Sequence, residues 1–323
     1  MNKYKSIISK FSKAKILVIG DLILDEYVWG NVSRISPEAP VPVVWVNRES
    51  YMPGGASNVA SNIRSLEGEV YIAGVVGSDS RAEKLIELLS ENGVTTEGII
   101  ADPNRPTTLK TRIIAGHQQV VRVDREKIEH LPTAILKDIV SYAEKIIPQV
   151  DAVIIEDYGK GVITPMLLKP IIKCARVNKK IITVDPKEEH ISYYQGVTSL
   201  TPNNHEASVT VGIKIKDEET LEAAGKKLLK KLNAESVLIT RGENGMCLFE
   251  KSGKITKIPT AAQEVFDVSG AGDTVISVFT LALACGASLQ DAAKISNIAA
   301  GIVVGKVGVA VVNQKELIKK MSS

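Results

Sequence analysis

The sequence predicts an α/β protein with a mainly parallel central sheet, helices on both faces of that sheet, and a small projecting β-sheet. Short apolar segments alternate with helical patterns along most of the chain, which is typical of buried parallel strands covered by helices. Two segments, 27–52 and 107–124, interrupt this alternation and have the pattern of half-exposed strands. We expect these two segments to pair into a lid at the carboxyl edge of the main sheet, where α/β proteins bind their ligands.

Apolar runs and turn residues define the elements of the first half. Pro37, Pro40 and Pro42 exclude a helix from the first lid segment and favour edge strands there. Gly54-Gly55 is expected to turn the chain into the helix that follows. The predicted elements are a strand at 15–21, edge strands within 27–52, a helix at 53–66, a strand at 70–77, a helix at 81–92 and a hairpin at 107–124 around Ala115-Gly116.

The second half repeats the alternation. Thr164 and Pro165 are typical of a helix N-cap and first position, whereas Pro170 predicts a kink one turn later. The predicted elements are a helix at 133–147, strands at 151–161, 180–186, 199–203 and 236–242, a helix at 217–233, a hairpin of 246–250 with 254–260, and helices from about 273 and about 289.

Composition limits the class of protein. The 323 residues can form one large α/β domain or two smaller ones. The 40 basic and 37 acidic residues give a net charge of +3, which argues against a nucleic-acid surface and allows a small anionic substrate. Cys174, Cys247 and Cys285 are far apart and predict buried, reduced thiols. Since no signal peptide or apolar run of about 18 residues occurs, we expect a cytoplasmic protein that does not bind membranes.

Polar residues follow the predicted strands, at the edge where parallel strands end. Single Asp and Asn residues at such positions often only form turns and helix caps. Several on one rim, together with the glycine-rich turn in FDVSGAGDTV at 266–275, favour a shared pocket for an anion at a helix N-terminus. The strand-end residues are Asp21, Asp25, Asp157, Lys160, Asp185, Asn203, Glu206, Arg241 and Gly242.

Other common site motifs are missing from the sequence. It contains no G-x-x-x-x-G-K-[ST] loop, no G-x-G-x-x-G after the first strand and no G-x-S-x-G elbow, which disfavours P-loop hydrolases, dinucleotide-dependent oxidoreductases and α/β-hydrolases. The histidines show no metal-ligand spacing, so we expect surface or capping roles for His117, His130, His190 and His205.

Several motifs together resemble the signatures of the ribokinase (PfkB-type) carbohydrate kinases. They are GGASNVA at 54–60, TPNNHE at 201–206, ITRGENG at 239–245 and DVSGAGD at 267–273. Their order and spacing match over essentially the whole chain. The resemblance implies one ribokinase-like three-layer α/β/α domain over 1–323, with the projecting lid, and an ATP-dependent sugar kinase that uses Mg²⁺ and K⁺.

A narrower resemblance is to the kinase domain of the D-glycero-β-D-manno-heptose 7-phosphate kinases. It covers 33–43, the diglycine segment, 157–165, 184–187, 201–207 and 300–308. It implies phosphorylation of C1 of the heptose 7-phosphate, a step of ADP-heptose biosynthesis for lipopolysaccharide. In many bacteria this domain is fused to a nucleotidyltransferase with an H-x-G-H signature, which this sequence lacks. We therefore expect a kinase without that domain, working beside a separate heptose-1-phosphate nucleotidyltransferase.

Two positions depart from the family pattern. Glu67 occurs where the first signature usually has Gly or Ser, and we expect the turn to shift by one residue onto Gly68. Val278 replaces a small residue of the second signature. Neither is a reacting group.

The resemblance also implies roles for individual residues. Asp273 would be the catalytic base, and the backbone amides of Gly270, Ala271 and Gly272 would stabilise charge on the transferred phosphoryl group. For the nucleotide, the resemblance implies that the phosphates lie along Thr240, Arg241, Gly242 and Gly245, and that the adenine lies at Asn297, Ala300 and Gly301. It also implies that Asn203 and Glu206 hold hydrated Mg²⁺ and that Asp267 binds a monovalent cation.

On the sugar side, the resemblance implies that Asp25, Gly54, Gly55 and Asn58 contact the acceptor, and Asp157 is a further candidate. A phosphorylated sugar also needs cations, for which Lys110, Arg112 and Lys160 are preferred to Arg34. Two alternatives stay open: a ribokinase-like kinase for another sugar or nucleoside, and a non-catalytic sugar-binding protein. The apolar stretch VPVVWV at 41–46 predicts a homodimer through the lid.

Overall fold

A computed structural model describes residues 3–116, 118–262, 264–306, 308 and 310–322. Within these residues one sheet has nine strands, and a second sheet has four. The strands of the large sheet are β1 (Lys15–Gly20), β4 (Glu69–Gly77), β5 (Thr95–Asp102), β8 (Ala152–Glu156), β9 (Ile181–Asp185), β10 (Ser199–Leu200), β11 (Ser236–Thr240), β12 (Met246–Glu250) and β13 (Ile255–Ile258).

The large sheet is parallel except at one edge. Its order is β13-β12-β11-β10-β9-β8-β1-β4-β5, and only the pairs β11–β12 and β12–β13 are antiparallel. The carboxyl ends of β1, β8, β9, β10 and β11 therefore meet along one rim. The predicted parallel sheet is confirmed.

Helices cover both faces because alternate residues of each strand point to opposite sides. Ile16 and Val18 of β1 belong to one apolar core, and Leu17 and Ile19 belong to the other. The first core packs against α1 (Lys3–Ile8), α2 (Ala56–Ser65), α3 (Ser80–Glu91), α8 (Ala271–Ala284), α9 (Leu289–Val303) and α10 (Gln314–Ser322). The second packs against α4 (Thr133–Ile146), α5 (Pro165–Val177), α6 (Asn204–Val211) and α7 (Glu218–Leu232).

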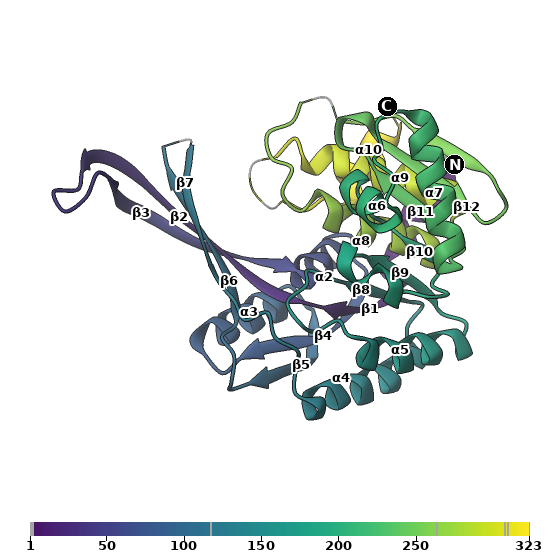
Figure 1. Cartoon of the computed structure of the whole chain (residues 1–323), viewed down its shortest axis with the longest axis horizontal. Coiled ribbons are helices and arrows are strands. Elements are labelled where there is room, and N and C mark those ends of the chain that lie inside the picture. The colour runs from purple at the N-terminus through teal and green to yellow at the C-terminus, as the bar shows by residue number, and fades with distance from the viewer. Residues whose placement is uncertain (1–2, 117, 263, 307, 309, 323) are drawn as a thin grey trace.

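The small sheet projects from this body as a long arm of strands (Figure 1). It consists of β2 (Leu22–Ile35), β3 (Pro42–Gly55), β6 (Thr108–Ala115) and β7 (Gln118–Arg125), in the order β3-β2-β6-β7. β2 pairs antiparallel with β3 and parallel with β6, so the two segments expected to form a lid do pair. His117 of the second segment lies outside the described residues.

Short 3₁₀ helices and caps complete the chain. The 3₁₀ helices are η1 (Phe11–Lys13), η2 (Ile147–Gln149), η3 (Glu188–Tyr193) and η4 (Gly242–Asn244). The Thr164 hydroxyl accepts the Leu167 amide at 3.3 Å, which confirms the predicted cap, and α5 continues through Pro170. Within the described residues, no helix combines the length and the apolar character needed to cross a bilayer.

The structure differs from the sequence predictions at a few elements. α1, β5 and α10 were not predicted, because each is short or half-exposed and lacks a long apolar pattern. The strand expected at 199–203 has only two residues. The turn at Glu67 does not shift: Glu67 itself adopts a left-handed φ of 67°, which is uncommon for a residue other than glycine.

Candidate active site

A pocket of about 150 Å³ lies where the lid strands meet the first turn of α8. It combines residues from β2, β3, α2, β6, the loop after β8, and α8. The distance in sequence between these elements explains why only the folded chain forms the pocket. Its lining residues are Ile23, Asp25, Gly55, Asn58, Lys110, Arg112, Tyr158, Ser269, Gly270 and Asp273.

Asp273 is the most enclosed carboxylate of this pocket, with 4% of its surface exposed. Asn58 Nδ2 donates to its Oδ2 at 2.6 Å, and the Tyr158 hydroxyl donates to its Oδ1 at 2.8 Å. The side-chain amide of Asn62 donates to Asn58 Oδ1 at 3.2 Å, so the amino group of Asn58 faces Asp273. Burial raises the pKa of Asp273, while the hydrogen bonds from Asn58 and Tyr158 act in the opposite direction.

The glycine-rich turn directly precedes Asp273. Gly270 has a left-handed φ of 76° and serves as the N-cap of α8. The amide of Ala271 donates to the Val268 carbonyl at 3.2 Å, so it is already engaged. The amides of Gly270 and Gly272 are therefore the better candidates to face an anion at this helix N-terminus.

Asp25 and the lid cations form the other wall. Asp25 pairs with Arg112, and both side chains are largely buried. Gly54 approaches Asp25 so closely that a Cβ on Gly54 would lie 2.3 Å from Asp25 Oδ2. Lys110 has no carboxylate partner within the described residues, and its Nζ lies 5.4 Å from the ring centroid of Tyr158. Burial lowers the pKa of Lys110, which indicates an ammonium that would gain from an anionic partner.

Lys160 and Arg34 do not line this pocket. Lys160 Nζ pairs with Glu126 at 2.8 Å, with only 16% of the lysine side chain exposed. Arg34 lies in the exposed distal part of β2. Of the four predicted phosphate-binding cations, the fold thus brings Lys110 and Arg112 to the pocket.

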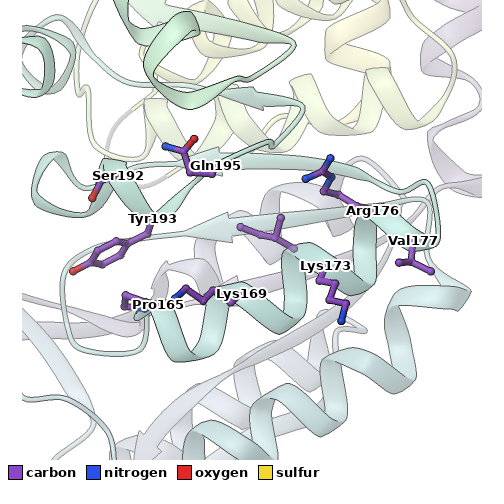
Figure 2. Close-up of a pocket in the computed structure, with 9 residues that line it drawn as sticks. Pro165, Lys169, Lys173, Arg176, Val177, Ser192, Tyr193 and Gln195 are labelled. Carbon is purple, nitrogen blue, oxygen red and sulfur yellow. The ribbon is translucent and has the colours of Figure 1, made fainter.

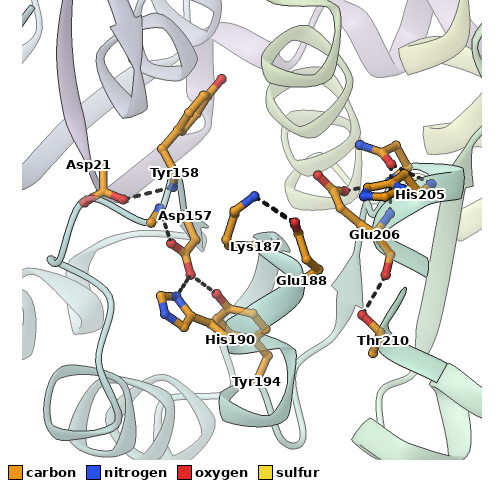
Figure 3. Close-up of polar contacts among 12 residues, drawn as sticks. Asp21, Asp157, Tyr158, Lys187, Glu188, His190, Tyr194, His205, Glu206 and Thr210 are labelled. Atoms are coloured by element: carbon orange, nitrogen blue, oxygen red, sulfur yellow. Dashed lines mark hydrogen bonds and ion pairs between the residues drawn. The ribbon is translucent and has the colours of Figure 1, made fainter. Parts of the chain in front are cut away.

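The loop after β8 is held by two buried carboxylates (Figure 3). Asp21 accepts the amides of Tyr158, Lys160 and Val162 at 2.9–3.2 Å. Burial raises the pKa of Asp21 to about 6, and the nearby charge of Asp157 adds to this shift.

Asp157 itself is turned away from the pocket. It accepts the amide of Gly159 at 2.8 Å and contacts His190 Nδ1 at 2.7 Å and the Tyr194 hydroxyl. Its side chain is fully buried, so it supports the loop rather than facing a sugar. His190, for which a surface or capping role was expected, is half-buried and contacts Asp157, whereas His130 and His205 are exposed.

Three carboxylates meet beneath the pocket. One oxygen from each of Glu156, Asp185 and Asp273 can be chosen so that all three lie within 4.8 Å of one another. Glu156 is fully buried, and within the described residues no N–H or hydroxyl donor reaches either of its oxygens. Burial raises the pKa of Glu156 and of Asp185 well above the usual range. A bound cation or a shared proton would offset this buried negative charge, and Mg²⁺ prefers such oxygen ligands.

Asn203 and Glu206 form a capping box at the start of α6. Asn203 Oδ1 accepts the Glu206 amide at 3.0 Å, and Glu206 Oε2 accepts the Asn203 amide at 2.8 Å. A β-bridge places Asn203 beside Thr240, so two predicted nucleotide motifs are neighbours on the rim. Arg241 pairs with Glu218 of α7 at 2.8 Å through one nitrogen of its guanidinium.

Gly242 and Gly245 lie in the turn between β11 and β12. Both have positive φ values, 57° and 74°. Gly245 packs so tightly that an added Cβ would lie 2.1 Å from the Ile258 carbonyl oxygen, so its role in the structure is to close this turn.

The predicted adenine side contains a cavity of about 700 Å³ between α9, the 261–266 loop and α10. Gly301 lines this cavity, but Ala300 and Asn297 do not. The Asn297 amide donates to the Pro259 carbonyl at 2.8 Å and so fixes the preceding loop. Asp267 accepts the amides of Ser269 at 2.9 Å and Gly308 at 3.2 Å, and therefore links two loops beside the glycine-rich turn.

Another cavity, of about 770 Å³, lies between α5 and η3 (Figure 2). It contains none of the residues that the sequence predicted for the site. Its basic side chains, Lys169, Lys173 and Arg176, are exposed. It is therefore separate from the pocket around Asp273.

Sequence reasoning missed Glu156 and Tyr158. Glu156 ends an apolar run, and a carboxylate at the end of a fully buried strand is a usable signal. Tyr158 had no comparable signal, because its contact with Asp273 joins residues 115 positions apart.

Known proteins resemble this chain in sequence and in fold. Residues 13–316 match the family model described as pfkB family carbohydrate kinase. A relative named Bifunctional protein HldE from Desulfatibacillum aliphaticivorans is 48% identical over 310 residues, covering 96% of this chain and 63% of the relative. A protein of the same name from Geobacter metallireducens is 46% identical over 320 residues, covering 98% and 65%. The chain thus spans slightly less than two thirds of the length of these curated relatives.

Solved structures share the fold at low sequence identity. Arabidopsis thaliana ribokinase complexed with ribose and ATP has a TM-score of 0.75 at 20% identity, covering 96% of this chain and 99% of that one. Phosphofructokinase-2 from Escherichia coli in complex with potassium has a TM-score of 0.79 at 18% identity, covering 96% and 98%. The predicted ribokinase-like fold is confirmed.

Proposed function

The chain belongs to the pfkB family of carbohydrate kinases, and from this premise we propose that it transfers phosphate from ATP to C1 of D-glycero-D-manno-heptose 7-phosphate, giving the β-1,7-bisphosphate. The observation that carries the proposal is the pocket itself. One buried carboxylate, Asp273, and one half-buried ammonium, Lys110, face the same small space beside a helix N-terminus. A kinase for a phosphorylated sugar needs a base for the hydroxyl and a cation for the phosphate.

Asp273 would accept the proton of the acceptor hydroxyl as the oxygen attacks the γ-phosphorus. In the loose transition state of phosphoryl transfer, charge spreads over the equatorial oxygens. The amides of Gly270 and Gly272 and the dipole of α8 are suited to stabilise that charge. Asn58 and Tyr158 keep the Asp273 carboxylate in place.

We assign the phosphate of the sugar to Lys110, supported by Arg112. Arg112 already pairs with Asp25, and Lys160 with Glu126, so their charges are largely offset. Lys110 has no such partner in the described part of the chain. Asp25, held against Gly54, is suited to accept hydrogen bonds from sugar hydroxyls.

The nucleotide would extend from the glycine-rich turn past Thr240 to the cavity at Gly301. The carboxylates of Glu156 and Asp185 fit a divalent cation better than Asn203 does, whose side-chain oxygen is engaged in the cap of α6. Glu206 keeps one oxygen outside the cap bond and could bind through water. When bound, Mg²⁺ would neutralise charge on the β- and γ-phosphates. We keep Asp267 as the residue for a monovalent cation.

A homodimer through the lid and a cytoplasmic location belong to the same proposal. The lid exposes a row of apolar residues, and the three cysteines are free, although Cys174 and Cys285 are only half-buried. ATP as the phosphate donor also favours the cytoplasm. The separate heptose-1-phosphate nucleotidyltransferase stays a prediction.

The direct test is ADP release with Mg²⁺ and K⁺ over a panel of D-glycero-D-manno-heptose 7-phosphate, fructose 6-phosphate, mannose, ribose and adenosine. We expect a strong preference for the heptose phosphate. The Asp273→Asn variant should lose about 10²- to 10⁴-fold in kcat, the usual contribution of a general base.

The other possible results of this experiment would each contradict a part of the proposal. A preference for fructose 6-phosphate, ribose or adenosine would contradict the heptose assignment and support another kinase of this family. Full activity of Asp273→Asn would contradict the role of the base. No turnover with any acceptor, together with intact ATP binding, would favour a non-catalytic sugar-binding protein.

A further inference from the structure

Tyr158 occupies a special position between the loop after β8 and the first turn of α8. Its hydroxyl donates to Oδ1 of Asp273 at 2.8 Å, while Asn58 donates to Oδ2 at 2.6 Å. Two donors from different elements thus hold the two oxygens of one carboxylate. An ionised carboxylate can only accept hydrogen bonds, so the phenol of Tyr158 acts as the donor in this contact.

The backbone that carries Tyr158 is tightly held. Asp21 accepts the Tyr158 amide at 2.9 Å and two further amides of the same loop. Asp157, the preceding residue, is anchored to His190 and Tyr194 of the η3 region. Figure 3 shows this arrangement, with the Tyr158 ring pointing away from the anchored carboxylates. The loop is therefore a rigid support for the Tyr158 side chain, which extends from the loop into the pocket.

The ring of Tyr158 has a second contact in the same pocket. Lys110 Nζ lies 5.4 Å from the ring centroid, within the range of a cation–π interaction. Tyr158 thus touches both the residue assigned as the base and the cation assigned to the phosphate of the sugar.

We propose that Tyr158 is a positioning residue for phosphoryl transfer: its hydroxyl fixes the Asp273 carboxylate toward the acceptor hydroxyl, and its ring supports the Lys110 ammonium. Tyr158 donates a hydrogen bond and transfers no proton. The inference rests on the proposed function, because it takes Asp273 as the base. The physical reason for this role is that phosphoryl transfer requires the acceptor oxygen to lie close to its line of attack on the γ-phosphorus. A displacement of about 1 Å in the reacting groups can lower the rate about 10²-fold.

The first test is Tyr158→Phe, which removes the hydroxyl and keeps the ring. We expect kcat to fall roughly ten- to a hundredfold, with the KM values for ATP and for the acceptor within about threefold of the wild type. Tyr71→Phe is the matched control, because it removes a tyrosine–carboxylate hydrogen bond to Glu69 of 2.6 Å at the opposite, amino end of the sheet. The control should leave kcat and KM unchanged.

The second test places Tyr158→Phe in the Asp273→Asn background. If Tyr158 acts through Asp273, the residual rate should change less than about twofold, because the group that it positions is already disabled. An equal loss in both backgrounds would overturn the proposal. So would an unchanged kcat in Tyr158→Phe, or a raised acceptor KM at unchanged kcat.

Failure of the proposed function can be told apart from failure of this inference. If the wild type does not phosphorylate heptose 7-phosphate, the substrate assignment is wrong whatever Tyr158 does. The two-variant cycle is then measured with the acceptor that the wild type uses best, or with ATP hydrolysis by water. The outcomes stated above would then support or contradict the positioning role of Tyr158 in the same way.

Discussion

At the scale of single residues, the site is distinguished by charged side chains that line the pocket rather than pairing with neighbours outside it. Lys160 and Asp157 pair with neighbours outside the pocket, whereas Asp25, Lys110 and Asp273 line it. Asp25 pairs with Arg112 and Asp273 accepts two hydrogen bonds, so Lys110 is the charge of the three that has no ion-pair or hydrogen-bond partner among the described residues. Because a buried charge without a partner is costly, such groups indicate where a ligand completes the structure. This reasoning gives two predictions about individual side chains.

The first concerns Lys110. Lys110→Met should raise the KM for the phosphorylated acceptor about ten- to a hundredfold, because a hydrogen bond to a charged group contributes about 1.5–3 kcal/mol and each 1.4 kcal/mol is tenfold. The KM for ATP should stay within about twofold. Steady-state kinetics measure both. Lys84→Met, which removes a surface lysine paired with Glu87, is the control. An unchanged acceptor KM in Lys110→Met would show that another cation binds the phosphate.

The second concerns His190. Its hydrogen bond to Asp157 raises the pKa of His190 above the usual 6.5. The folded state therefore binds the proton more tightly than the unfolded state, and the stabilisation is fully present below pH 6.5 and is lost as pH rises through the raised pKa. We expect the free energy of unfolding to fall over this interval in the wild type but not in His190→Gln.

Denaturant titrations at several pH values above 6.5 measure this difference. Asp21, with a pKa of about 6, titrates mainly below that range and is present in both proteins, so it does not account for a difference between them. Parallel pH profiles for the wild type and His190→Gln would contradict the prediction.

At the scale of elements, helix N-termini have two different uses in this protein. The first turn of α8 begins at a left-handed Gly270 and carries no side-chain cap, so the amides of Gly270 and Gly272 are candidates to face an anion. The first turn of α6 is closed by the Asn203–Glu206 capping box. The helix N-terminus is thus open at the reacting end of the proposed site and closed by a cap at Asn203 and Glu206, for which the sequence predicts Mg²⁺ binding.

This contrast predicts how Asn203→Ala behaves. Loss of the cap should lower the free energy of unfolding by about 1 kcal/mol. If Asn203 also holds hydrated Mg²⁺, the Mg²⁺ concentration for half-maximal activity should rise severalfold. Chemical denaturation and Mg²⁺ titration of the activity measure the two effects.

Asp217→Ala is the matched control, since Asp217 forms the equivalent box at the start of α7. It should lower stability and leave the Mg²⁺ dependence unchanged. A Mg²⁺ dependence of Asn203→Ala equal to that of the control would restrict Asn203 to capping and favour Glu156 and Asp185 as ligands.

At the scale of the whole molecule, the lid is both part of the site and an exposed apolar surface. Its inner ends supply Asp25, Lys110 and Arg112 to the pocket, while its outer part extends from the body (Figure 1). Among its exposed residues are Ile35 and Trp45, at 61% and 69%. A sheet with such a face favours association with a second copy.

We therefore predict that Trp45→Glu converts a dimer into a monomer. Size-exclusion chromatography with light scattering should give twice the 34.8 kDa chain mass for the wild type at micromolar concentration, and the single chain mass for the variant. Val177→Glu, at a position 74% exposed on α5, is the control and should stay dimeric. A monomeric wild type would contradict assembly through the lid.

The sequence by itself determined the order of strands and helices, the parallel sheet, the lid segments and the motif around Asp273. Each of these depends on local periodicity or on neighbouring residues, as in the apolar run before Gly20 or the cap at Thr164. β5 and α1 were not predicted, because their burial comes from contacts with residues distant in sequence rather than from an apolar pattern of their own.

Only the tertiary structure decided which charges face the pocket. Asp157 and Lys160 follow the same strand as Tyr158, yet Asp157 contacts His190, Lys160 contacts Glu126, and Tyr158 contacts Asp273. These pairings join residues 33, 34 and 115 positions apart. The direction of a side chain on a loop is set by the partners that satisfy its polar atoms, and those partners become neighbours only when the sheet and the lid have formed.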